Sequence, residues 1–426
     1  MNKRTKTTLR RWCLYGWTLA KWTMAASAIG VVCGLIGTMF HFGVHEVTAF
    51  RGTHPWVLYL LPLAGFVIVS FYKLTETDGL GTDDIIDAVH EGKRLPILLL
   101  PAIFFGTVLT HLCGGSAGRE GAALQMGGTI GQCMGRTFRL DDRDLRVATL
   151  AGMAAFFSAL FGTPLAATVF AIMVISIGVL YHVALYPSLL AALVAYGVSV
   201  RLGVEPTRFT VAVPDQSVGM FVRVAALGVL CALVSILFCK LMHGAGHLMK
   251  RIKNPWLRVI CGGFAVIALT WVFGTDYNGA GMDIVTQAIE QETVAVPWAF
   301  LLKLVFTAVT LAAGFKGGEV VPSFFVGATF GCAVSPLLGL PVGFGAAVGL
   351  AAVFCGVTNC PVASTLLAVE LFGAEGMLYF ALACCLSYML SGYQGLYSSQ
   401  TILYSKLKAQ FINVHTNAYH AGEKTE

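Results

Sequence analysis

Charge is scarce in this chain of 426 residues. Only 12% of the residues are charged and 57% are hydrophobic, whereas soluble domains carry about 25% charge. This composition excludes an ordinary soluble domain. The 12 cysteines include no Cys-x-x-Cys pair, so nothing in their spacing favours a metal or redox site, and we interpret them as small buried apolar side chains. No cofactor is expected.

Apolar runs long enough to cross a membrane recur along the whole chain, since about 20 residues span the hydrocarbon core as a helix. They cover 14–40, 55–72, 96–112, 147–183, 184–200, 218–244, 257–274, 297–313, 325–357 and 362–392. The sequence therefore predicts an all-α polytopic membrane protein with ten or more helices, some of them partial.

The basic stretch MNKRTKTTLRRW begins the chain and leads into an apolar segment too long for a signal peptide. By the positive-inside rule we expect this end in the cytoplasm and the protein in a prokaryotic plasma membrane. We interpret the net charge of +6 as a consequence of membrane topology and of contact with lipid. No basic face with interleaved aromatics suggests a nucleic-acid partner.

The chain repeats itself at an offset of 200 residues. The matching positions are Thr107/Thr307, Thr110/Thr310, Gly114/Gly314, Gly118/Gly318, Gly127/Gly327, Thr129/Thr329 and Gly131/Gly331. We expect a cytoplasmic segment 1–13, a first repeat 14–200, a linker 201–217, a second repeat 218–405 and a cytoplasmic tail 406–426, with no cytoplasmic regulatory domain. Transporters built from repeats bind their substrate where broken helices of the two repeats meet.

Two glycine-rich breaks stand at corresponding positions of the repeats, "GGSAGREGAALQMGG" (114–128) and "GFKGGEVVPSFFVGATFG" (314–331). Each precedes a predicted helix, and a helix N-terminus inside a membrane offers unpaired N–H groups to an anion. Two such ends that face one spot could hold a small dehydrated anion. Glu120 could occupy that spot when ionised and leave it when protonated, so we interpret it as a gate rather than as half of an ion pair with Arg119.

These residues carry a family resemblance. "GREG" (118–121), the Gly-rich element "GGEVVP" (317–322) and "GLYSSQ" (395–400) resemble the CLC family of chloride channels and anion/proton exchangers over about 14–405. The resemblance implies a homodimer of inverted repeats, with one pore in each subunit. It implies that Glu120 is the external gate and that the anion-binding residues include Gly118, Arg119, Gly121, Val320, Val321 and Tyr397.

Departures from the chloride pattern point toward the branch that exports fluoride in exchange for protons. "GREGA" and "GGEVVP" are two of them. A third is the segment "DGLGTDDII" (78–86), where chloride members place a coordinating serine. Here either Leu80, beside Gly81, or Asp84 faces the central anion. The acids at 83 and 84 also suit the first turn of a helix.

The sequence leaves open whether transport is coupled to protons. Chloride/proton exchangers of the family carry an internal glutamate where this chain has Met173 or Val174. Glu370 is its counterpart in the second repeat and is expected near the dimer-side or cytoplasmic end. Fluoride export, with or without exchange for protons, is the favoured function. A passive chloride channel without proton coupling is the alternative.

Other signals are less specific. Gly114-x-Ser116-x-Gly118, with His111 nearby, matches a serine-hydrolase pattern, but the α/β context that the pattern needs is missing, so an intramembrane serine protease is a remote alternative. His41 and His45 are interpreted as interfacial. Lys316 either forms an ion pair with Glu319 or raises the local anion concentration.

Overall fold

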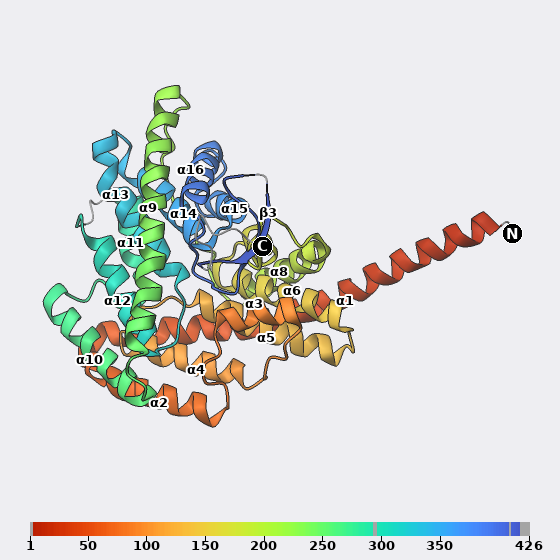
Figure 1. Cartoon of the computed structure of the whole chain (residues 1–426), viewed down its shortest axis with the longest axis horizontal. Coiled ribbons are helices and arrows are strands. Elements are labelled where there is room, and N and C mark those ends of the chain that lie inside the picture. The colour runs from red at the N-terminus through yellow and green to blue at the C-terminus, as the bar shows by residue number, and fades with distance from the viewer. Residues whose placement is uncertain (1–2, 293–295, 409, 418–426) are drawn as a thin grey trace.

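The computed structural model describes residues 3–292, 296–408 and 410–417 (Figure 1). The first half contains α1 (Lys3–Thr53), η1 (Pro55–Leu60), α2 (Leu61–Leu74), α3 (Thr82–Glu91), α4 (Leu99–Leu112), α5 (Glu120–Thr137), α6 (Asp142–Phe161), α7 (Pro164–Met173), η2 (His182–Ala184) and α8 (Leu185–Arg201). The second half contains α9 (Val218–Met249), α10 (Pro255–Phe273), α11 (Met282–Glu290), α12 (Ala299–Ala313), α13 (Val320–Leu338), α14 (Val342–Thr358), α15 (Pro361–Phe372) and α16 (Met377–Leu390).

In the described part of the chain, each half contains eight α-helices, α1 to α8 in the first and α9 to α16 in the second. Helices α4, α5 and α6 begin at residues 99, 120 and 142, and α12, α13 and α14 begin at 299, 320 and 342, which is 200 residues later in each case. Helices α7 and α15 both begin with a proline, Pro164 and Pro361. The sequence repeat is therefore a repeat of structure.

The two halves are inverted, as predicted, and they meet at Gly118 and Gly318. These equivalent residues form an isolated antiparallel bridge, in which each backbone N–H donates to the other's carbonyl at 2.8 Å. Ser116 N donates to the hydroxyl of Thr310 at 3.1 Å, and Lys316 N donates to that of Thr110 at 3.2 Å. Equivalent groups that exchange hydrogen bonds in this way are related by a local two-fold axis.

Glycines let the innermost helices approach each other closely. A Cβ atom at Gly127 of α5 would clash with the carbonyl oxygen of Gly152 on α6. The equivalent Gly327 of α13 has the same relation to Gly349 on α14. Small residues at helix contacts are typical of membrane proteins, where packing rather than the hydrophobic effect holds helices together. The two pairs form the buried centre of the molecule.

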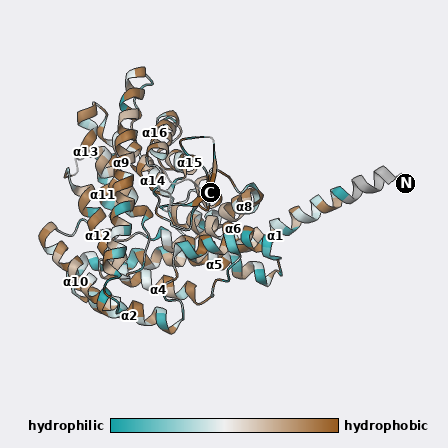
Figure 2. Cartoon of the chain, viewed as in Figure 1, coloured by the Kyte–Doolittle hydropathy of each residue, from teal (hydrophilic) through white to brown (hydrophobic). Residues whose placement is uncertain are grey.

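The described helices include seven that are long and apolar enough to cross a membrane, and six shorter apolar ones. Hydrophobic residues lie along the outer surface of helices such as α9 and α10 (Figure 2), where Leu233 is 59% exposed and Phe264 is 61% exposed. These surfaces suit contact with lipid, and the chain is a multi-pass membrane protein.

A small sheet departs from the all-α prediction. Strands β1 (Ser176–Ile177), β2 (Thr401–Tyr404) and β3 (Phe411–His415) pair in the order β1-β2-β3. The contact between β1 and β2 is parallel, and that between β2 and β3 is antiparallel. Strands of two to five residues are too short to leave an alternating pattern in the sequence. β3 lies in the segment predicted as a tail.

Candidate functional site

The site begins with two helix N-termini that lack side-chain caps. Helix α5 starts at Glu120, with Arg119 as its N-cap residue, and α13 starts at Val320, with Glu319 as its N-cap residue. Neither N-cap side chain makes a capping hydrogen bond to its own helix. The first N–H groups of both helices are therefore open to another acceptor. The Gly118–Gly318 bridge holds the two ends side by side.

The carboxylate of Glu120 is that acceptor. The side chain is 1% exposed, and its Oε2 accepts a hydrogen bond from Arg119 N at 2.9 Å. The backbone N–H of Val321, from the other half of the chain, also points to this carboxylate. A Cβ atom at Gly118 would clash with Oε2, so glycine leaves the space that the carboxylate fills. An anionic group thus occupies the point where both halves present N–H donors.

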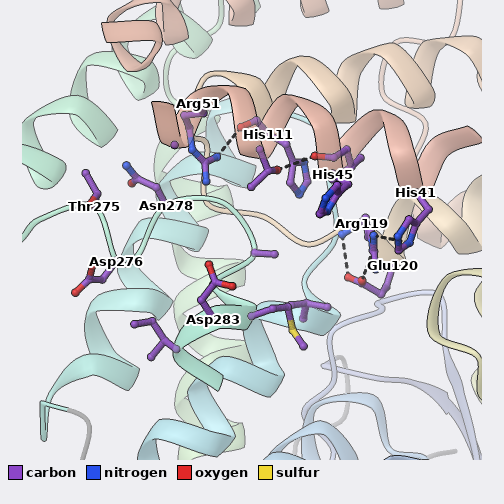
Figure 3. A pocket seen from close by; sticks show the side chains of 18 of the residues that line it. His41, His45, Arg51, His111, Arg119, Glu120, Thr275, Asp276, Asn278 and Asp283 are labelled. Carbon is purple, nitrogen blue, oxygen red and sulfur yellow. Dashed lines mark hydrogen bonds and ion pairs between the residues drawn. The ribbon is translucent and has the colours of Figure 1, made fainter. Parts of the chain in front are cut away.

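A cavity of about 620 Å³ lies on one side of Glu120. We call it the Arg119 cavity; Arg51, His111, Glu120, Asp276 and Asp283 also line it (Figure 3), as does Val321. Arg119 Nη1 pairs with His41 Nδ1 at 3.0 Å, and the Nε of Arg119 lies 3.7 Å from Oε1 of Glu120. His41 and His45 both line this cavity, and their interfacial position stays a prediction.

A second, smaller cavity of about 260 Å³ is lined by Lys316, and we call it the Lys316 cavity. Its other lining residues include Tyr72, Leu80, Gly81, Asp83, Asp84, Gln125, Gly317, Glu319 and Tyr397. Helix α3 starts beside it, with Gly81 as N-cap residue, and Asp84 Oδ2 accepts the N–H of Gly81 at 2.8 Å. Leu80 and Asp84 both line the cavity, and the carboxylate of Asp84 already caps its own helix.

Tyr397 is held by the small sheet. Its side chain is 3% exposed, and its hydroxyl has no hydrogen-bond partner among the described residues. Gln400 fixes the loop by donating from its amide to the carbonyl oxygens of Val174, at 2.9 Å, and Thr358, at 3.0 Å. Thr416, just after β3, donates from its backbone N–H to Gln400 O at 2.9 Å.

The predicted site residues thus fall into two adjoining groups. The residues of the helix junction are Gly118, Arg119, Glu120, Gly121, Val320 and Val321. The residues of the Lys316 cavity are Leu80, Gly81, Asp84 and Tyr397. The junction connects them, because a Cβ atom at Gly121 would lie 3.6 Å from Oε2 of Glu319, which lines the Lys316 cavity. A cavity therefore adjoins each side of the junction.

Sequence reasoning misses three parts of this arrangement. It treats Glu319 only as a partner of Lys316, but the described residues include no ion pair between them. It treats Tyr72 only as part of an apolar run. It does not anticipate that His41 lines a cavity, although its spacing of four residues from His45 could have placed both on one helix face. No local signal identifies the other two.

Glu370 lies at the wrong end of α7 to replace the internal glutamate. Its carboxylate accepts the backbone N–H groups of Leu165, at 3.1 Å, and Ala166, at 2.8 Å, and so caps the start of α7. Met173 is the last residue of that helix. The expected dimer-side or cytoplasmic position of Glu370 stays a prediction. Glu370 and Met173 lie at opposite ends of α7, whose start follows Phe161, a residue that lines the Arg119 cavity. The inversion of the repeats explains this, because equivalent positions lie at opposite ends.

The hydrolase pattern has no catalytic geometry. The hydroxyl of Ser116 pairs with that of Thr307 at 3.0 Å, and His111 Nδ1 bonds to Thr107 O at 2.9 Å. Neither side chain bonds to the other, whereas a nucleophile and its base must be in hydrogen-bond reach. The bond of Ser116 joins the two halves of the chain, and that of His111 lies within α4.

Comparisons with known proteins agree with this arrangement. A chloride/fluoride channel protein of Pseudomonas syringae pv. tomato is 39% identical over 400 residues, covering 91% of this chain and 88% of the relative. The crystal structure of a CLC-type fluoride/proton antiporter matches with a TM-score of 0.88 at 32% identity, covering 91% of this chain and 99% of that one.

A slow cyanobacterial Cl⁻/H⁺ antiporter matches with a TM-score of 0.76 at 19% identity, covering 87% of this chain and 94% of that one, and this likeness concerns the fold alone. The family model described as voltage gated chloride channel matches residues 63–392. Inverted repeats that meet at two helix N-termini, a buried glutamate between them and these matches lead to one conclusion: the chain belongs to the CLC family.

Proposed function

We propose that the protein carries halide ions across the membrane through a pathway gated by Glu120, with fluoride favoured over chloride. The observation that carries the proposal is the position of the Glu120 carboxylate, which receives N–H groups from Arg119 and from Val321 of the opposite repeat. A halide that replaces the carboxylate would receive the same N–H groups. Helix N-termini suit an anion without a fixed full charge, so the ion can also leave.

The gating mechanism that we propose depends on the protonation of the Glu120 carboxyl group. When it is ionised, it competes with the halide for the same donors. When it is protonated, it is neutral and becomes a weaker acceptor, because bonds to charged groups are roughly twice as strong. We infer that flux increases as the pH falls, and that one proton bound by Glu120 accompanies its displacement.

Two kinds of support favour fluoride. The segment around Leu80 offers no serine hydroxyl, and GGEVVP departs from the motif of the chloride branch at the same position. The two relatives that are 39% and 32% identical to this chain are named for chloride and fluoride and for fluoride, respectively. Exchange for protons is our preferred mode, since one of those relatives is a fluoride/proton antiporter. A passive chloride channel is the second candidate, favoured by the absence of a carboxylate at Met173 and Val174.

We also propose an orientation. Helix α1 runs from the basic N-terminal stretch to Arg51, which lines the Arg119 cavity. Helix α2 then returns and brings Tyr72 to the Lys316 cavity. With the basic end in the cytoplasm, the Arg119 cavity opens to the outside and the Lys316 cavity faces the cytoplasm.

Ion-selective efflux from vesicles tests the function. The full chain is reconstituted into phospholipid vesicles loaded with fluoride or chloride, and release is measured with and without a pH gradient. We expect fluoride to leave faster than chloride and a proton gradient to drive fluoride uphill. Equal rates for both ions would remove the fluoride preference. A flux that ignores the pH gradient would favour the passive channel, and absence of both fluxes would contradict halide transport.

A further inference from the structure

Lys316 carries a positive charge that has no anionic partner in the described part of the chain. Its ammonium group lies 4.1 Å from the ring centroid of Tyr72, a cation–π contact, and no described carboxylate or carbonyl oxygen pairs with it. It is the one lysine or arginine among the described residues that line the Lys316 cavity. Charges within membrane proteins are costly and mark ion pathways.

The cavity also contains two phenol groups without partners. The hydroxyls of Tyr72 and Tyr397 are buried, and no described group bonds to either of them. The two side chains are 1% and 3% exposed. A buried donor without an acceptor is destabilising, so these hydroxyls call for a ligand. Tyr397 belongs to the proposed pathway already, whereas Tyr72 has no role in it.

Two of the acids that line the cavity, Asp83 and Asp84, accept backbone N–H groups. Asp83 Oδ1 accepts the backbone N–H of Ser399 at 3.0 Å, and Asp84 caps α3. Asp78, Asp84 and Arg258 are the charged groups near enough to influence Lys316 electrostatically. A cavity lined by Asp83, Asp84 and Glu319 would repel a halide. The charge of Lys316 offsets this repulsion at the place where the ion enters.

The pair of Lys316 and Tyr72 is held in position by a glycine of α4. A Cβ atom at Gly106 would lie 3.1 Å from Cγ of Lys316 and 3.2 Å from Cε2 of Tyr72. Both side chains therefore pack against the same stretch of helix. The ammonium group and the phenol lie together at the wall of the cavity rather than in solvent.

We propose that Lys316 and the hydroxyl of Tyr72 bind a halide ion in the Lys316 cavity before it reaches the helix N-termini. The ammonium group supplies charge and N–H donors, and the phenol supplies an O–H donor. The ion that occupies this site is the missing partner of both groups. The inference rests on the proposed halide transport and adds two ligands to the cytoplasmic side of the pathway.

Concentration dependence of transport tests the site. Fluoride flux into and out of vesicles that contain the full chain in a known orientation is measured as a function of fluoride on each side. We expect Lys316→Gln to raise the half-saturating fluoride concentration about tenfold on the Lys316-cavity side alone. Tyr72→Phe keeps the ring, and we expect it to raise the same quantity by about threefold to tenfold.

Lys73→Gln is the matched control. Lys73 lies next to Tyr72 and also makes a cation–π contact, 4.0 Å from the ring centroid of Trp256, but it does not line the cavity. We expect its half-saturating concentration to stay at the wild-type value. Lys316→Arg keeps the charge and is expected to recover most of the affinity. In the double variant, the effects of Lys316→Gln and Tyr72→Phe should be non-additive, because both groups bind one ion.

Two results would overturn the site while wild-type transport remains intact. One is an unchanged half-saturating concentration in Lys316→Gln and Tyr72→Phe. The other is a shift of equal size on both sides of the membrane, or an equal shift in the Lys73 control. A wild-type protein that moves no halide would instead contradict the proposed function, so the two failures are distinguishable.

Discussion

At the scale of single residues, Glu120 and Gly118 depend on each other. The carboxylate fits at the junction because Gly118 has no side chain, and it stays there because Arg119 and Val321 direct N–H groups to it. His41 in turn pairs with the guanidinium group of Arg119. The proposed gate is therefore a side chain supported by backbone donors from both halves and, through Arg119, by one histidine of α1.

The first prediction concerns Glu120→Gln. A carboxamide fills the same space but cannot exchange a proton, so we expect the halide efflux of this variant to lose its dependence on pH. The measurement is efflux from vesicles at several pH values. A variant with the wild-type pH dependence would show that another group is the gate.

Glu370→Gln provides the matched control for this substitution. Glu370 is also a partly buried carboxylate that accepts two backbone N–H groups, but it caps α7 and does not line either cavity. We expect it to keep the pH dependence of the wild type, although weaker capping of α7 lowers its stability by about 1 kcal/mol. A loss of pH dependence in both variants would indicate a general effect of removing a carboxylate.

At this scale, sequence reasoning works where chemistry is unusual. Glu120 could be predicted because an ionisable side chain is costly inside an apolar chain and is retained there mainly for function, and because its glycine-rich surroundings mark a broken helix. Tyr72 could not, because a tyrosine in an apolar run is most often packed core. The choice between Leu80 and Asp84 stayed open because both lie within one turn of the start of α3 and both line the Lys316 cavity.

At the scale of secondary-structure elements, the contacts of α5 with α6 and of α13 with α14 determine where the two helix N-termini lie. Each contact depends on a glycine at an equivalent position, Gly127 or Gly327. The helices themselves start where glycine-rich loops end, at Glu120 and Val320. A change in either contact should therefore affect stability first and the junction second.

We predict that Gly327→Ala destabilises the protein. The added methyl group meets the backbone of Gly349, which cannot move as a flexible side chain would. Overpacking of this kind costs about 1–3 kcal/mol, and thermal unfolding in detergent should show it as a lower midpoint. Gly197→Ala in α8 is the control: no heavy atom lies within 4 Å of the added Cβ atom, and we expect an unchanged or slightly higher midpoint. Equal midpoints for both variants would contradict the packing argument.

The elements differ in how well the sequence predicts them. Long apolar helices such as α9 are evident from hydropathy, and the start of α5 follows from its glycines. The sequence did not predict the three-stranded sheet. Strands β1 and β2 lie more than 200 residues apart along the chain, at residues 176 and 401, and β2 and β3, although close in sequence, are only four and five residues long. Such pairing depends on tertiary contacts rather than on local propensity.

At the scale of the whole molecule, the question is how copies of the chain associate. We propose a homodimer, in line with the resemblance noted from the sequence. Helices α7 and α15 lie side by side through their contacts, and each presents an exposed apolar residue near its start, Leu165 at 48% and Val362 at 50% exposure. Such residues can contact either lipid or a second subunit.

The prediction is that the purified protein has twice the mass of one chain. A single chain is 45.4 kDa, and light scattering corrected for bound detergent measures the protein mass directly. We expect substitutions of Leu165 or Val362 by Trp to shift the population toward single chains if α7 and α15 form the interface. A monomeric wild-type protein that still transports halide would contradict the dimer.

The division of the molecule into two structural repeats could be predicted from the sequence repeat. An offset of 200 residues recurred at seven positions between 107 and 131, and the same offset relates the starts of three pairs of helices. The inversion and the position of Glu370 could not be derived from the offset, because a repeat says nothing about the direction in which its copies cross the membrane.

The bridge between Gly118 and Gly318 uses only main-chain atoms. A substitution by proline removes an N–H donor, and no substitution removes a carbonyl acceptor. Any other substitution disturbs the bridge only through a side chain that crowds it. The two copies were thus free to diverge, with a glutamate at position 120 and a valine at position 320. Asymmetric chemistry, a proton-binding group on one side and a hydrophobic one on the other, can arise on a symmetric frame without loss of the frame itself.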